Sequence, residues 1–154
     1  MQEKELPHLL FLCTGNSCRS QMAEALGRAK LGERYRFSSA GLVARGVDPI
    51  VPRVLAELDV ESADLSSSRL DSLLQGELDP IDYVVTVCGH ADEHCPHFPG
   101  RTRRLHIPFD DPPKLSEGID DEEEILAVYR RVRDEIAAMI DQLPELLSSA
   151  PSAR

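Results

Sequence analysis

A cysteine and an arginine lie six positions apart in a polar loop that directly follows an apolar run. The run spans residues 9–12, Cys13 comes next, and Arg19 ends the loop. If the run is a buried strand and a helix begins near Cys18, the N–H groups of the loop converge and bind a tetrahedral anion. Arg19 then closes this anion-binding cradle with two parallel hydrogen bonds. The predicted cradle consists of Thr14, Gly15, Asn16, Ser17, Cys18, Arg19 and Ser20.

Cys13 is placed to attack a bound oxyanion. The same N–H groups and the positive end of the following helix favour its thiolate, the nucleophilic form of cysteine. The Ser20 hydroxyl can also donate a hydrogen bond to the sulfur. Attack expels oxide or hydroxide, so the reaction needs a proton donor. Two adjacent carboxylates, Asp110 and Asp111, precede Pro112 and are the candidates.

Four short apolar segments are predicted to be the strands that carry these residues. They span residues 8–12, 35–40, 83–87 and 104–107. Each is followed by a loop and usually by a helical pattern, an alternation typical of a parallel α/β sheet. Ligands bind such sheets at the carboxyl ends of the strands. Cys13, Cys88 and the pair Asp110–Asp111 follow the first, third and fourth segments, so we expect them at one edge.

Helical spacing of apolar residues predicts the remaining elements. Three helices are predicted over residues 22–29, 51–58 and 70–74. The clearest pattern is a fourth, final helix that begins at Ile125 and is predicted to end at Pro144. Residues 112–118 are predicted to be a loop. The chain therefore divides into a single catalytic domain, residues 1–147, and a flexible C-terminal tail, residues 148–154.

Composition and charge limit the classes of function. The chain has 154 residues, 42% hydrophobic and 29% charged, which is typical of a globular protein. It lacks an apolar run that could cross a membrane and a basic, apolar leader, so we expect a cytoplasmic monomer with no membrane partner. A net charge of −10 argues against nucleic acid. Six acids gather between Glu117 and Glu124, whereas Arg19 is the one charged side chain of the cradle.

The cradle sequence resembles the low-molecular-weight protein tyrosine phosphatase superfamily, whose loop is Cys-x5-Arg-Ser/Thr after the first strand. Residues 13–24 are Cys-Thr-Gly-Asn-Ser-Cys-Arg-Ser-Gln-Met-Ala-Glu. With Gln21 after Ser20, the sequence resembles the thioredoxin-coupled arsenate reductase branch, in which glutamine is common at this position. The phosphatases usually carry proline at the same position. The resemblance covers residues 9–143 and implies a small flavodoxin-like α/β fold, a parallel four-stranded sheet flanked by helices. It implies an oxidoreductase of arsenical resistance with no bound cofactor, which reduces arsenate and accepts phosphate or sulfate as analogues.

The resemblance also implies supporting residues. The general acid of the superfamily directly precedes a proline, which implies Asp111. Ser39 would support the cradle from below, and the Asn16 amide would hold its backbone. Some reductases of the branch bind potassium beside the cradle through Asn, Glu, Ser and an Asp-containing loop. Asn16, Glu24 and Ser39 match this pattern, but residues 65–68 are Leu-Ser-Ser-Ser and hold no carboxylate.

Two further cysteines distinguish a reductase from a phosphatase. Cys88 and Cys95 have six residues between them. By resemblance, Cys13 forms a thiol–arsenate adduct, Cys88 attacks Cys13 and releases arsenite, and Cys95 attacks Cys88. Thioredoxin then reduces the resulting disulfide. The segment between the two cysteines is polar and is expected to be a mobile loop, and His90 and His94 could lower the thiol pKa values when protonated.

Cys88 must pair with Cys13 in one state and with Cys95 in another, so the segment that carries it must move. A disulfide tolerates Cα atoms only about 4.4–6.8 Å apart, and a helical or extended segment would hold Cys88 and Cys95 beyond that range. We therefore expect residues 88–99 to refold between the reduced and oxidised forms, while the sheet and the last helix stay fixed.

Other functions fit parts of the same pattern. A phosphatase needs one thiol because water completes turnover, so the site of Cys13, Arg19 and Asp111 also fits a tyrosine phosphatase. A metal- or metalloid-binding protein is a second alternative, because five soft ligands lie within ten residues, namely Cys88, His90, His94, Cys95 and His97. Cys88 also fits a buried residue that ends an apolar strand. Cys18 is either packed against the first helix or forms a protective disulfide with Cys13.

Overall fold

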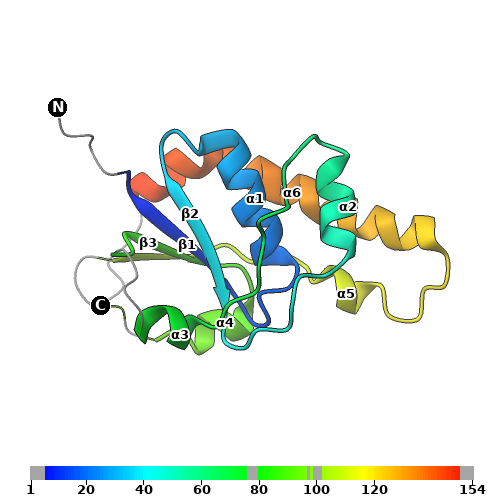
Figure 1. Cartoon of the computed structure of the whole chain (residues 1–154), viewed down its shortest axis with the longest axis horizontal. Coiled ribbons are helices and arrows are strands. Elements are labelled where there is room, and N and C mark those ends of the chain that lie inside the picture. The colour runs from blue at the N-terminus through cyan, green and yellow to red at the C-terminus, as the bar shows by residue number, and fades with distance from the viewer. Residues whose placement is uncertain (1–5, 76–79, 97, 99–101, 150–154) are drawn as a thin grey trace.

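The computed structural model describes residues 6–75, 80–96, 98 and 102–149, which form a four-stranded sheet with flanking helices (Figure 1). The strands are β1 (His8–Cys13), β2 (Arg36–Gly41), β3 (Tyr83–Thr86) and β4 (Arg103–His106). The helices are α1 (Arg19–Leu31), α2 (Ile50–Ala56), α3 (Leu70–Gln75), α4 (Gly89–Glu93), α5 (Pro112–Leu115) and α6 (Glu122–Ser148). All neighbouring strands are parallel, in the order β2-β1-β3-β4. The predicted fold class is confirmed.

Strand β1 is the centre of the sheet and carries the cradle at its end. It is buried along its whole length because it lies between β2 and β3, which explains its unbroken apolar sequence. Cys13 pairs with Gly41 of β2, and Leu12 pairs with Thr86 of β3. The carboxyl ends of the three strands therefore meet at one edge, as predicted.

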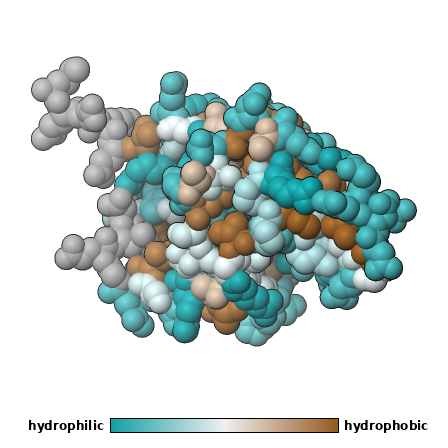
Figure 2. All heavy atoms as spheres, turned by 45° about the vertical axis from the view of Figure 1, so that its right-hand side comes forward, coloured by the Kyte–Doolittle hydropathy of each residue, from teal (hydrophilic) through white to brown (hydrophobic). Residues whose placement is uncertain are grey.

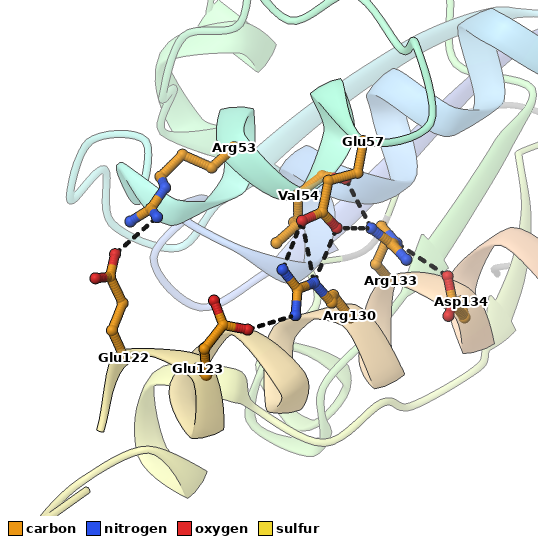
Figure 3. A network of polar contacts seen from close by, with 8 residues as sticks. All are labelled: Arg53, Val54, Glu57, Glu122, Glu123, Arg130, Arg133 and Asp134. Carbon is orange, nitrogen blue, oxygen red and sulfur yellow. Dashed lines mark hydrogen bonds and ion pairs between the residues drawn. The ribbon is translucent and has the colours of Figure 1, made fainter. Parts of the chain in front are cut away.

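Helices α1 and α6 pack against each other, and α2 packs against both. The buried residues of α6 recur at helical spacing and face this contact; they include Leu126, Tyr129, Val132, Ile136, Ile140 and Leu143. Charged residues add a network between α2 and α6 (Figure 3): Arg130 and Arg133 both bind the Glu57 carboxylate, which follows α2. Within the described residues, no helix is long and apolar enough to cross a lipid bilayer.

Three local predictions are corrected by the structure. Helix α6 continues through Pro144 to Ser148, because proline removes only one helical hydrogen bond and Leu143 and Leu147 are buried on either side of it. A short helix, α5, replaces the start of the loop predicted at residues 112–118, since two prolines suit its first turn. Helix α4 occupies part of the segment predicted as a loop after Cys88. Residues 150–154 of the predicted tail lie outside the described residues, so the domain boundary stays a prediction.

Candidate active site

The shape of the cradle is held from its centre by Asn16. This residue is fully buried and has a positive φ of 48°, a conformation that asparagine tolerates. Its Nδ2 donates to Ser20 Oγ and Ser39 Oγ, both at 2.9 Å. Its Oδ1 accepts from the Ser68 N–H at 2.7 Å. Asn16 and Ser39 thus lie together beneath the loop, whereas Ser20 contacts Asn16 and makes no hydrogen bond to Cys13 among the described residues.

Two further residues fit the loop to its surroundings. Gln21 is fully buried, and its Nε2 donates to the carbonyl oxygens of Asn16 and Ser66, each at 2.9 Å. Gly41 ends β2 against the loop, where a Cβ atom would lie 2.7 Å from Asn16 N and 2.8 Å from Thr14 O. Glycine is therefore required at this close approach.

Arg19 lies at the rim of the cradle and faces Asp111. Its Nη1 donates to the Phe109 carbonyl at 3.1 Å, and its Nη2 lies 3.7 Å from an Asp111 carboxylate oxygen. The Nε of Arg19 is buried and has no hydrogen-bond partner within the described residues, so it is the donor that a bound oxyanion would satisfy. The neighbouring Asp110 instead pairs with Arg131 of α6 at 3.2 Å. The geometry therefore brings Asp111, and not Asp110, to the cradle.

A cavity of about 350 Å³ opens over the cradle. Its lining includes Cys13, Arg19, Asp111 and an exposed second arginine, Arg45. The aliphatic part of Arg45 lies over Gly15, where an added Cβ would come within 2.9 Å of Arg45 Cδ. Sequence reasoning missed Arg45, because the residue lies 26 positions after Arg19 in a loop. An adjoining cavity of about 460 Å³ is lined by Thr14, Arg19, Asp111 and the Cys88 segment.

Cys88 lies beside the predicted nucleophile. Its sulfur hydrogen-bonds the Thr14 hydroxyl at 3.2 Å and accepts from the Ala91 N–H at 3.4 Å. A hydrogen bond between Cys88 and Cys13 raises the pKa of Cys13, as burial also does, and lowers the pKa of Cys88. The interaction therefore favours the thiolate on Cys88 over the thiolate on Cys13. Hydrogen bonds from Thr14 and Ala91 lower the pKa of Cys88 further, and the Cys13 thiolate expected from the sequence stays a prediction.

The other two cysteines are separate from this pair. Cys95 is half-buried beyond α4, and its Sγ donates to the Pro96 carbonyl at 3.6 Å; burial raises its pKa. Cys18 is buried at the start of α1, where burial raises its pKa, followed by the charges of Asp48 and Asp111. All four cysteines are free.

Comparison with protein families matches residues 8–151 to the family described as low molecular weight phosphotyrosine protein phosphatase. The chain belongs to this family. An arsenate reductase of Halalkalibacterium halodurans is 45% identical over 137 residues, which cover 89% of this chain and 94% of that protein. Among solved structures, a thioredoxin-dependent arsenate reductase of Corynebacterium glutamicum has a TM-score of 0.62 at 29% identity and covers 94% of this chain and 63% of that chain.

Phosphatases of the family are equally similar in fold. A low molecular weight protein tyrosine phosphatase from T. tengcongensis has a TM-score of 0.68 at 27% identity and covers 91% of this chain and 99% of that chain. The family membership therefore supports an enzyme that uses the Cys-x5-Arg cradle, and curated relatives of this chain are arsenate reductases.

The potassium ligands expected from some members of the family do not fit a cation here. Asn16 directs its amide nitrogen toward Ser39, and both carboxylate oxygens of Glu24 are already used. Ser39 Oγ donates to one at 2.6 Å, and Arg28 Nη2 lies 2.8 Å from the other. A guanidinium thus already neutralises this carboxylate.

The cysteine and histidine cluster is also not gathered as a metal site. Cys88 faces Thr14, whereas His94 Nδ1 hydrogen-bonds the His90 carbonyl oxygen at 3.0 Å. His97, the remaining predicted ligand, lies outside the described residues. Among those described, no group of three or more His, Cys, Asp or Glu side chains is placed to hold a metal ion.

Proposed function

We propose that the protein is an arsenate reductase that works through Cys13, Cys88 and Cys95 and is re-reduced by thioredoxin. The observation that carries this proposal is the position of the second thiol, Cys88, whose sulfur lies 3.2 Å from the Thr14 hydroxyl of the cradle and which lines one cavity with Arg19 and Asp111. Hydrolysis has no use for a thiolate at this position, whereas reduction of an arsenic adduct needs one. The arsenate reductases among the relatives support the same choice of substrate.

The first step forms a covalent adduct. The N–H groups of the cradle and Arg19 bind arsenate, with phosphate or sulfate as analogues of the same shape. Cys13 passes its proton to Cys88 and attacks arsenic, so that an S–As bond forms and an As–O bond breaks. Asp111 donates the proton with which the departing oxygen leaves as water.

The next steps transfer two electrons. Cys88 gives the proton that it received to an oxygen of the arsenic adduct, and its thiolate attacks Cys13 Sγ; an S–S bond forms, the S–As bond breaks, and the electron pair stays on arsenic, which leaves as arsenite. Cys95 then attacks Cys88 and releases Cys13 as a thiolate. The dithiol of thioredoxin reduces the Cys88–Cys95 disulfide, so no bound cofactor is needed.

The position of α4 supports a change of conformation in the last exchange. Hydrogen bonds from Asp92 N to Cys88 O and from His94 N to His90 O keep the segment helical. Seven residues at about 1.5 Å rise separate two Cα atoms by roughly 10 Å, which exceeds the reach of a disulfide. Cys95 therefore reaches Cys88 after α4 unwinds.

The experiment compares two activities of one protein. The parent is expected to oxidise NADPH in an arsenate-dependent way with thioredoxin and thioredoxin reductase, and to hydrolyse p-nitrophenyl phosphate weakly. Cys88→Ser or Cys95→Ser should abolish multiple turnover of arsenate and keep ester hydrolysis, because only reduction needs their electrons. Cys13→Ser should lose both activities. Equal losses of both activities in Cys88→Ser would reject the relay and favour a tyrosine phosphatase that uses Cys88 structurally.

A further inference from the structure

A buried carboxylate lies directly under the cradle. The Glu24 side chain is 9% exposed, and its neighbours are Ser39 of β2, Arg28 of the same helix, and Asp64 of the segment after α2. Burial raises the pKa of Glu24, and the Ser39 hydrogen bond and the Arg28 charge oppose this rise. The position therefore needs a cation beside it to keep the carboxylate ionised.

A continuous series of hydrogen bonds connects this carboxylate to the cradle. Ser39 Oγ donates its single proton to Glu24 Oε1 at 2.6 Å, which leaves its lone pairs to accept from Asn16 Nδ2 at 2.9 Å. Asn16 must then present Oδ1 to the Ser68 N–H. The charge on Glu24 thus determines the direction of every donor up to the strained centre of the loop.

Arg28 supplies the cation from within the chain. Its Nη2 lies 2.8 Å from Glu24, its Nη1 lies 3.0 Å from Asp64, and Nη2 also donates to the Phe37 carbonyl at 3.4 Å. These groups line a small polar cavity of about 160 Å³, which includes Ser39, Ser66 and Ser68. The guanidinium therefore fills the position where a metal ion would contact Glu24.

We propose that Arg28 is a positioning residue whose guanidinium serves as the built-in cation of the cradle, acting through Glu24, Ser39 and Asn16 on oxyanion affinity. The protein consequently needs no added potassium. The identity of the oxyanion as arsenate rests on the proposed function, but the positioning role does not, because any tetrahedral oxyanion uses the same loop.

The test measures how well sulfate, an oxyanion that the thiols do not reduce, protects Cys13 from iodoacetamide, with the alkylated residue identified by mass spectrometry. Protection is measured in KCl and in tetramethylammonium chloride at equal ionic strength. For the parent we expect the same protection in both salts. For Arg28→Met we expect about fivefold weaker protection in tetramethylammonium chloride and recovery in KCl, because only the small ion enters the cavity beside Glu24. Arg28→Lys should stay close to the parent.

Two controls separate this role from general stabilisation. Lys30→Met removes another ion pair of α1, with Asp141 at 2.9 Å, and should leave protection unchanged in both salts. In a Glu24→Gln background, Arg28→Met should have no further effect, since the connection is already broken. Unchanged protection in Arg28→Met, or a loss that is the same in both salts, would overturn the proposal. The readout involves neither Cys88 nor Cys95, so a failure of the reductase assay leaves this result interpretable.

Discussion

At the scale of single residues, the arrangement of Cys13 and Cys88 fits the order of the two attacks in the proposed relay. In a coupled pair of thiols, either sulfur can be the anion while the other is the thiol. The positive charge of Arg19 lowers the pKa of both residues. The negative charge therefore stays near this guanidinium when the proton moves from one sulfur to the other. In the proposed relay Cys13 attacks first, and Cys88 then lies next to the sulfur that it attacks.

This pairing predicts a change in the reactivity of Cys13. The hydrogen bond with Cys88 raises the pKa of Cys13, so Cys88→Ala should lower that pKa. The rate of alkylation of Cys13 by iodoacetamide, measured against pH, should then rise at a lower pH than in the parent. The matched control is Cys95→Ala, which leaves the pair intact. A Cys88→Ala profile that coincides with the parent would show that the hydrogen bond with Cys88 does not govern reactivity.

The sequence was sufficient for the residues that local spacing defines. Cys13, Asn16 and Arg19 belong to one loop, and Asp111 precedes a proline, so each could be named in advance. Gln21, Arg28 and Arg45 act through contacts with segments distant in sequence, such as Ser66 with Gln21 and Asp64 with Arg28. No local pattern marks such contacts, because an arginine on a helix or in a loop is most often a solvated side chain.

At the scale of elements, the ion pair between Asp92 and Arg104 holds helix α4 against β4. Arg104 donates to the carbonyl and to the carboxylate of Asp92. The same carboxylate accepts from the Thr86 hydroxyl at 3.1 Å. Burial opposes ionisation of Asp92, but the hydrogen bond from Arg104 outweighs it and the pKa is lowered. The pair thus stabilises the helical form in which Cys88 and Cys95 are apart.

Loss of this ion pair should ease the unwinding of α4. In Asp92→Asn, amide hydrogen exchange of α4 in the reduced protein should become faster, by about fivefold for the loss of a half-exposed charge. Exchange in β1 and α6 should stay unchanged. In the parent, oxidation to the Cys88–Cys95 disulfide should accelerate exchange of the same segment. Identical protection of α4 in the reduced and oxidised parent would contradict the predicted refolding of residues 88–99, of which His97 and Pro99 lie outside the described residues.

Residues 45–48, the segment before α2, lie against the outer side of the cradle, and their position depends on the contacts of α2. The segment before α2 binds the loop through hydrogen bonds from Arg45 N to Gly15 O at 2.9 Å and from Asp48 N to Ser17 O at 3.0 Å. The Tyr129 hydroxyl of α6 donates to Asp48 at 2.6 Å. At the other end of α2, Arg133 donates to the Val54 carbonyl at 2.8 Å, a contact visible in Figure 3. Helix α6 thus holds both the segment before α2, through Asp48, and the end of α2, through Val54.

We expect Arg133→Met to destabilise the fold more than Arg130→Met. Arg133 is 8% exposed and binds a buried carbonyl, so its removal should lower the free energy of unfolding by about 2 kcal/mol. Arg130 is more exposed and should matter less. Urea unfolding checks both values.

The parent should also lose stability as the pH falls from about 4.3 toward 2, because Arg130 and then Arg133 lower the pKa of Glu57 to about 2. This pH effect should be smaller in Glu57→Gln.

The elements themselves followed from the sequence to different degrees. The four strands and α1, α2 and α6 have strong apolar periods and were predicted close to their observed bounds. Pro144 gave a wrong helix end, since burial of Leu143 and Leu147 outweighs the lost hydrogen bond. Helices α4 and α5 are too short to show an apolar period, and their N-caps, Cys88 and Asp111, are residues that the sequence marked as candidates for the site.

At the scale of the whole molecule, charge is distributed unevenly. The chain carries a net charge of −10, and hydrophilic side chains cover much of the face seen in Figure 2, with apolar side chains in separate patches. Much of the negative charge lies at the start of α6, where Glu122, Glu123 and Glu124 suit the positive end of the helix. At the cradle, Arg19 and Arg45 line the same cavity, so the approach to Cys13 has a positive entrance on an acidic protein.

Arg45 should therefore affect how fast an oxyanion reaches the cradle. It is exposed, and no acidic side chain in the described part of the chain pairs with it, so its charge is available to an approaching anion. Arg45→Glu should lower kcat/KM for arsenate by about tenfold at low salt and change kcat little, because steering acts on association. The difference from the parent should shrink as salt shortens the screening length. Arg103→Glu makes the same change of charge at the amino end of β4, away from the cradle, and should have little effect. A loss in Arg45→Glu that is independent of salt would mean that the residue acts by contact with the loop over Gly15 and not by its charge.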